Sequence, residues 1–199
     1  MRAAIAVLSL AMMTSACATV KDSEELKSIF DRGVAAYDAG NYAEAFALFK
    51  SIDQEDVAAA RNEGIMLRKG QGVAKDPEEA ERVLQLAAED GLPTAQYDYA
   101  EMLMDGEAGP PDVKGALPWL TLAASAGHPI AEYRLGTLYE QGEYVPKDIE
   151  KAKSLYADAA ARGVTAAADR LKTLGGPPPK PLHPQETGPA SPPPPASGP

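Results

Sequence analysis

The chain has 199 residues and a formal net charge of −10, and its hydrophobic fraction of 45% is typical of a folded globular protein. This acidic balance argues against a nucleic-acid partner, because neutralising a phosphate backbone requires clustered Lys and Arg. One cysteine excludes a disulfide framework and a multi-cysteine zinc site, and two histidines are too few for most histidine-based metal sites. We therefore expect no nucleic acid, no metal and no cofactor.

The N-terminal residues 1–16 are typical of an export signal, with Arg2 ahead of an apolar run and small residues beyond it. The apolar run has 11 residues, whereas a membrane-spanning helix needs about 20. Cys17 follows directly, an arrangement that resembles a bacterial lipobox, in which the cysteine receives lipid after cleavage. The resemblance implies an anchor in the bacterial cell envelope, on the periplasmic side and in the outer membrane. The alternative is ordinary cleavage after Ala18, which discards the cysteine.

Downstream of this signal, the chain repeats itself every 36 residues. Small, acidic and turn residues recur at this step, and one set extends the register into a fourth unit. They are Gly91, Gly127 and Gly163; Asp76, Asp112 and Asp148; and Ala59, Ala95, Ala131 and Ala167. A fixed period of this length indicates an array of stacked units, because no single unit can bury its apolar face alone.

Each unit has the pattern of two helices. In the last unit, Pro129 suits the first turn of one helix and Gly142 ends it. Asp148 is a natural N-cap for the second helix, which ends at Gly163. The recurring aspartates are therefore expected to cap helices rather than to form a carboxylate pair. His128, directly before Pro129, is expected to be a turn or N-cap residue rather than a catalytic one.

The repeated residues resemble the Sel-one-like repeat (SLR), a variant of the tetratricopeptide repeat, in three successive units. The matching positions are Gly64, Gly70–Val73, Asp76 and Ala87–Ala88 in the first; Ala95–Tyr97, Leu103, Gly106, Trp119–Leu120 and Gly127–Pro129 in the second; and Ala131–Gly136, Leu138–Tyr139, Gly142, Val145–Asp148, Ala152 and Gly163 in the third. The resemblance implies an all-α fold, an α-solenoid of stacked antiparallel helix pairs in a right-handed superhelix.

The segment before the repeats resembles one ordinary tetratricopeptide helix pair, whose second helix opens with Asn41 and Glu44 at the spacing of a capping box. The expected organisation is a signal peptide at 1–16, a lipidated linker at 17–21, the tetratricopeptide-like pair at 22–56, three SLR units at 57–163 (57–91, 92–127 and 128–163), a C-terminal capping helix at 164–175 and a Pro-rich disordered tail at 176–199.

The tail holds 11 of the 18 prolines and has no apolar periodicity, so it cannot bury a core. An alternative interpretation of the tail is a semi-rigid spacer or a ligand for a proline-recognising partner.

A further proline, Pro118, falls inside the second helix of the middle unit, where it removes the hydrogen bond to the carbonyl of Lys114. Gly115 weakens the same turn. The sequence therefore predicts that this helix starts late or is kinked near Pro118.

No pairing of a nucleophile with a base is visible, and no Gly-rich phosphate loop is present. We therefore expect a non-enzymatic scaffold or adaptor that binds a protein or peptide partner and is held at the membrane through Cys17. One alternative is a soluble periplasmic or secreted adaptor of the same fold. Another is a cell-wall hydrolase or a β-lactam-binding relative, although the paired cysteines of the β-lactam-linked SLR proteins are absent.

The resemblance also implies a binding face, because the first helices of such units line the concave side. Arg61, Tyr97 and Tyr133 occupy one position of successive units, and aromatic and arginine side chains are favoured at interface hot spots. The tyrosine of this motif also contributes to packing between units, which is the alternative role. The candidate partner-binding residues are Phe30, Arg61, Asn62, Tyr97, Asp98, Tyr133 and Arg134.

Overall fold

The computed structural model describes residues 22–177. The expected signal peptide, the linker with Cys17 and all but the first two residues of the Pro-rich tail lie outside the described residues. Within 22–177 the regular structure consists of nine α-helices and no strand. The helices are α1 (Ser23–Asp38), α2 (Tyr42–Lys50), α3 (Val57–Lys69), α4 (Pro77–Glu89), α5 (Pro93–Asp105), α6 (Val113–Ser125), α7 (Pro129–Gln141), α8 (Ile149–Ala161) and α9 (Thr165–Thr173).

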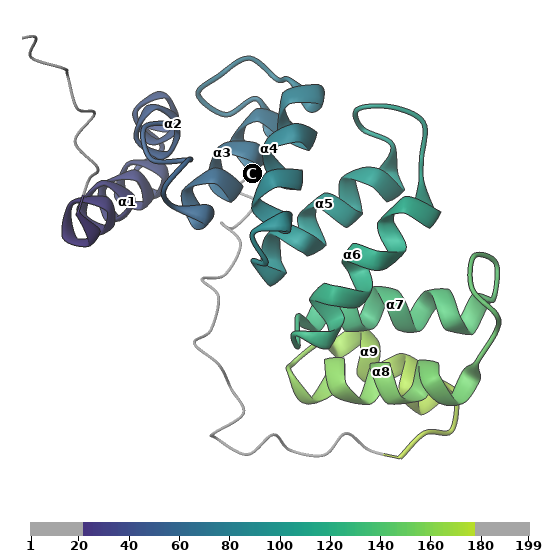
Figure 1. Cartoon of the computed structure of the whole chain (residues 1–199). Coiled ribbons are helices and arrows are strands. Elements are labelled where there is room, and N and C mark those ends of the chain that lie inside the picture. Colours follow the sequence, from purple (N-terminus) through teal and green to yellow (C-terminus); the bar gives the residue numbers. More distant parts are fainter. Residues whose placement is uncertain (1–21, 178–199) are drawn as a thin grey trace, which may run out of the picture.

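The helices follow one another along a curved stack, in which each helix packs mainly against its neighbours in the chain (Figure 1). Buried side chains from three consecutive helices share one core. Leu67, Leu84 and Met102, for example, lie on α3, α4 and α5 and belong to the same cluster. The prediction of an all-α solenoid of stacked helix pairs is confirmed.

The recurring aspartates cap the second helices, as predicted. Asp76, Asp112 and Asp148 each accept a hydrogen bond from the backbone N–H three residues later, at 2.8–3.0 Å. Such a cap satisfies one of the amides that a helix leaves unpaired at its start. Asn41 is also an N-cap by position, but its side chain makes no capping hydrogen bond, so the predicted capping box at α2 is wrong.

The small residues of the repeat allow two helices of one unit to approach closely. A Cβ atom added to Gly136 on α7 would lie 2.9 Å from the ring of Tyr156 on α8. Tyr156 is fully buried, so the ring has no free space to move into. Gly64 faces Leu84 in the same way, with a Cβ distance of 2.7 Å. The sequence periodicity of small residues therefore reflects helix-to-helix contact.

The prediction of a late or interrupted α6 is wrong. The helix begins at Val113 and continues through Pro118 to Ser125 without a break. Pro118 and Lys114 are both exposed, so the Lys114 carbonyl that loses its partner can be hydrated by water. The Asp112 cap and the buried face of α6, with Ala116, Leu120 and Ala123, hold the helix together on either side of the proline.

The loop between α3 and α4 packs against the N-terminal helix pair and so ties that pair to the first repeat. The residues that follow α3 return to the start of α2, where Gly72 lies against the backbone of Tyr42. The Tyr37 hydroxyl donates to Oε1 of Gln71 at 2.9 Å, and the rings of Tyr37 and Tyr42 meet edge to face with centroids 5.1 Å apart. This contact fixes the register between α1–α2 and the repeats.

At the other end, α9 packs Ala167 and Leu171 against Ala152 and Tyr156 of α8. Its remaining surface is mainly polar and exposed. This helix therefore covers the last apolar face of the stack, which a solenoid would otherwise leave open to water. No helix among residues 22–177 is both long enough and apolar enough to cross a bilayer.

Candidate functional site: a polar network on the first helices

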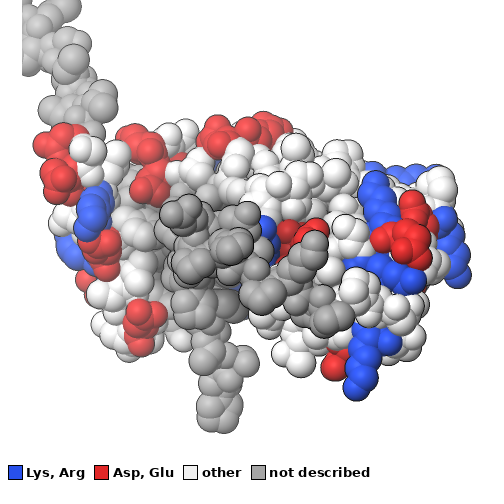
Figure 2. Space-filling model, turned by 90° about the horizontal axis from the view of Figure 1, so that it is seen from below, with Lys and Arg blue, Asp and Glu red and all other residues white. Residues whose placement is uncertain are grey.

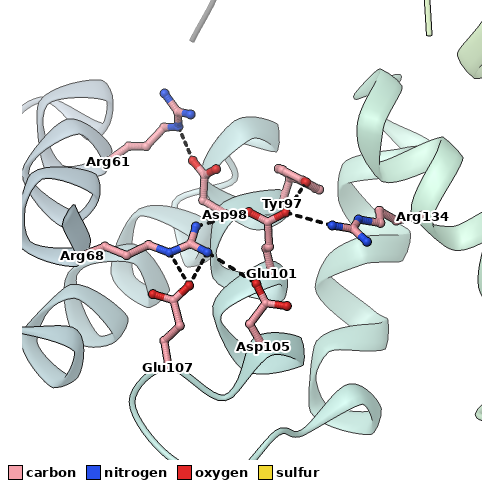
Figure 3. Close-up of polar contacts among 8 residues, drawn as sticks. All are labelled: Arg61, Arg68, Tyr97, Asp98, Glu101, Asp105, Glu107 and Arg134. Carbon is pink, nitrogen blue, oxygen red and sulfur yellow. Dashed lines mark hydrogen bonds and ion pairs between the residues drawn. The ribbon is translucent and has the colours of Figure 1, made fainter. Parts of the chain in front are cut away.

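Polar side chains on α3, α5 and α7, the first helices of the three repeats, meet in one network (Figure 3). Arginines from α3 and α7 reach α5 from its two sides, and acidic residues of α5 lie between them. The members are Arg61, Arg68, Tyr97, Asp98, Glu101, Asp105, Glu107 and Arg134. The network thus links three successive units through their side chains.

Arg61 pairs with Asp98 across the first two repeats. Its Nε donates to Oδ2 of Asp98 at 2.5 Å, and the Asp98 side chain is only 9% exposed. Burial raises the pKa of Asp98, and the charge and hydrogen bond of Arg61 act in the opposite direction. Without Arg61 this carboxylate would be buried without a partner, which is costly in a protein interior.

Arg68 lies about two turns after Arg61 on the same face of α3. It is the most buried cation of the network, with its side chain 17% exposed. It binds Glu107 through Nε at 2.7 Å and also through Nη2. Its Nη1 reaches Glu101 at 3.2 Å, and Asp105 lies 3.6 Å from Nη2. Burial lowers the pKa of Arg68, but Glu107 and Glu101 outweigh that effect and raise it, so the residue is always charged.

Glu101 is the junction of the network. Its carboxylate accepts from the Tyr97 hydroxyl at 2.6 Å, from Arg68 and, more weakly, from Nη2 of Arg134 at 3.4 Å. Burial raises the pKa of Glu101, and the hydrogen bonds from Tyr97 and Arg68 more than offset that, so that the pKa is lowered. The carboxylate is therefore ionised and already neutralised by its neighbours.

His128 borders the network from the start of α7. Its Nδ1 accepts from the backbone N–H of Ala131 at 3.2 Å, which confirms the predicted N-cap role. The imidazole stacks on the ring of Tyr97 with centroids 4.6 Å apart and an interplanar angle of 18°. Burial, helped by the charge of Arg61, lowers the pKa of His128 to about 4. The ring is therefore neutral at pH 7, with its proton on Nε2.

The structure brings together four of the seven candidate binding residues, Arg61, Tyr97, Asp98 and Arg134. The other three lie elsewhere. Tyr133 packs against Tyr156 with ring centroids 5.7 Å apart, and Phe30 packs on Phe49 at the same centroid distance. Asn62 is half-buried and takes no part in the network.

Sequence reasoning missed Arg68, Glu101, Glu107 and the stacking role of His128. Two of these left a detectable signal. Arg68 follows Arg61 by seven residues and Glu101 follows Tyr97 by four, spacings that place each pair on one helix face. Glu107 lies in the loop after α5, where helical periodicity gives no guidance. Among residues 22–177 no group of three or more His, Cys, Asp or Glu could hold a metal ion.

The stacked helix pairs and the network on their first helices define a helical-repeat protein. Comparison with protein families matches the Sel1 repeat to residues 57–92, 93–128 and 129–164. The chain therefore belongs to the Sel1 repeat family, and the predicted resemblance is confirmed. Proteins of this family are generally protein-interaction scaffolds and are typically non-catalytic.

Two solved structures support the assignment. The Sel1 repeat protein from Oxalobacter formigenes is 34% identical with a TM-score of 0.70, over 74% of this chain and 62% of that one. The protein c5321, described as a protective antigen of uropathogenic Escherichia coli with an SLR fold, is 28% identical with a TM-score of 0.69, over 75% of this chain and 33% of that one. The chain thus spans less than two thirds of either relative. A comparison with curated protein sequences gave no match.

Proposed function

We propose that the protein is a non-enzymatic scaffold of the bacterial envelope, which binds a protein partner on the face formed by α3, α5 and α7. The observation that carries this proposal is the network itself, which fixes aromatic and arginine side chains across three repeats. Arg61 and Arg134 keep their side chains 26% and 46% exposed while bound to α5. Rigid, partly exposed residues of these types are favoured as interface anchors.

The second part of the proposal is a lipid anchor at Cys17. Helix α1 begins at Ser23, so five residues, 18–22, separate the anchor from this helix. If Cys17 is lipidated, a linker of this length, at no more than about 3.5 Å per residue, would keep the first helix within roughly 20 Å of the membrane. The α1 end of the stack would then lie next to the bilayer, and the binding face would open beside it.

Affinity capture from detergent-solubilised envelope tests the scaffold function. The bait is compared with a face variant, Arg61→Gln/Asp98→Asn/Arg134→Gln, which leaves no buried carboxylate without its partner, and with a matched control on the second helices, Arg82→Ala/Leu86→Ala/Leu122→Ala. The control residues are all exposed. We expect the face variant to lose captured proteins that the control retains, at a similar thermal unfolding midpoint. Equal capture by both variants would place the partner elsewhere on the molecule.

Metabolic labelling with palmitate tests the anchor. We expect label in the wild type and none in Cys17→Ser. Label that persists in the variant would overturn lipidation at Cys17. An unlabelled wild type recovered in the soluble periplasmic fraction would favour the alternative, a soluble adaptor of the same fold.

A further inference from the structure

Three groups on the proposed binding face carry hydrogen-bond donors that are not used within the fold. Arg61 bonds Asp98 through Nε alone, and Figure 3 shows its two terminal nitrogens directed away from the other side chains of the network. The Nδ1 of His128 accepts the capping hydrogen bond, and its Nε2–H has no acceptor among the described residues. Arg134 makes a long bond to Glu101 and also interacts with the Tyr97 hydroxyl, and another of its nitrogens points away from the Glu101 carboxylate (Figure 3).

These donors lie next to each other although they come from three different segments. Arg61 is held to Asp98 and Arg134 to Glu101, and these two acids are one helical turn apart on α5. The imidazole of His128 stacks on Tyr97, the residue next to Asp98, and lies within electrostatic range of Arg61 and Glu101. The donors therefore border a single stretch of α5.

Two of the acidic residues beneath these donors, Asp98 and Glu101, are held in ion pairs and therefore repel an incoming anion less than free carboxylates would. Asp98 is neutralised by Arg61, and Glu101 is shared by Arg68, Tyr97 and Arg134. The side chain of Asp105 is the most exposed of the acids in the network, at 54%. Fixed ion pairs with outward-facing donors form a surface that is preorganised for a carboxylate, because arginine binds planar carboxylates in two-pronged geometry.

We propose that the ligand of this face is an extended acidic peptide, whose carboxylates bind Arg61, His128 and Arg134; this inference rests on the proposed scaffold function and names its partner class. An extended chain presents every second side chain to one side at steps of about 7 Å, so that successive acidic residues can reach donors on neighbouring helices. The net charge of −10 argues against a long polyanion such as nucleic acid. Single carboxylates need only the few donors present.

Fluorescence anisotropy with a labelled (Glu-Gly)4 peptide tests the proposal, with (Gln-Gly)4 as the uncharged probe. The variants are Arg134→Gln, the double variant Arg61→Gln/Asp98→Asn and His128→Asn. The double variant avoids leaving Asp98 buried without a partner, and asparagine is itself a good N-cap, so α7 stays capped. Arg82→Gln on α4 is the matched control, since it removes one exposed positive charge from outside the network.

We expect the (Glu-Gly)4 peptide to bind the wild type more weakly as salt rises, because the contacts are ionic. Arg134→Gln and the double variant should each raise the Kd about tenfold, and His128→Asn should raise it less. Arg82→Gln should change the Kd by less than about twofold. Asp98→Asn alone should bind at least as tightly as the wild type, because it frees the Nε of Arg61.

Three results would overturn the proposal. Equal loss in Arg82→Gln and Arg134→Gln would mean diffuse attraction by charge. Equal binding of (Gln-Gly)4 would assign the face to an uncharged peptide. Absence of (Glu-Gly)4 binding would exclude an acidic ligand, whereas the proposal that a protein partner binds this face fails only if the capture experiment shows no difference between face and control variants.

Discussion

Replacement of Gly72 by alanine should loosen the junction between α1–α2 and the first repeat. Gly72 has a φ of +74°, and an added Cβ would lie 2.2 Å from the carbonyl carbon of Tyr42 and 2.5 Å from the backbone nitrogen of Ala43. These are backbone atoms at the start of α2, so no side-chain rotation can relieve the overlap. Either the loop or the helix must move.

The magnitude follows from two separate costs. Alanine in the left-handed region costs about 1–2 kcal/mol, and the reduced freedom of the unfolded chain returns about 0.4–1 kcal/mol. Overpacking adds about 1–3 kcal/mol. We therefore expect Gly72→Ala to lower the free energy of unfolding by about 2–4 kcal/mol, measured by urea denaturation. Amide hydrogen exchange should show the loss of protection centred on α1 and α2.

Gly40→Ala is the matched control for this experiment. Gly40 has nearly the same backbone conformation, with a φ of +79°, but an added Cβ meets nothing within 4 Å. Gly40→Ala should therefore lower the free energy of unfolding only by the conformational cost, about 1 kcal/mol. If Gly72→Ala and Gly40→Ala are destabilised to the same extent, the contact between Gly72 and Tyr42 does not hold the junction, and the reasoning is wrong.

Three further predictions concern the described helices. Burial raises the pKa of Glu132 to about 7, so the stability it contributes is full below its ordinary pKa of 4.5 and is lost as pH rises through 7. Glu132→Gln should remove a fall of about 3 kcal/mol in urea-measured stability between pH 5 and 8; an unchanged pH profile would contradict this. Pro118→Ala should raise the free energy of unfolding by about 1–2 kcal/mol, because it restores a helical hydrogen bond. The thermal unfolding midpoint should rise accordingly. Arg68→Ala should lower stability by about 2–4 kcal/mol in urea denaturation, because it leaves the partly buried Glu101 and Glu107 without their main cation.

The solenoid could be predicted from sequence because its determinants are local. A 36-residue period, an aspartate before each second helix and a glycine after it act over a few residues and do not depend on distant contacts. Pro118 shows where local reasoning stops. The cost of the proline depends on whether the Lys114 carbonyl faces water or protein, and only the packing of α6 in the stack decides that.

The charge distribution of the surface needed the structure as well. On the face that Figure 2 shows, acidic side chains are scattered along the stack, and basic side chains gather mainly at one end, where acidic ones lie beside them. The ion pairs of the network are also long-range, for example Arg61 with Asp98 and Arg68 with Glu107. Their formation depends on how one repeat is rotated against the next, which a linear pattern does not specify.

The site lies where the repeats differ from one another, and Tyr97 and Tyr133 show this most clearly. They occupy one position of successive repeats, yet only Tyr97 has a glutamate four residues later; Tyr133 has Thr137, whose hydroxyl bonds the Tyr133 backbone carbonyl. The residue that stacks on Tyr97 is His128, and its counterpart one repeat later is Val164, an apolar side chain in the cluster that contains Tyr133. The shared pattern thus sets the position of both rings, whereas their non-repeated neighbours make Tyr97 part of a polar face and pack Tyr133 against an apolar core cluster.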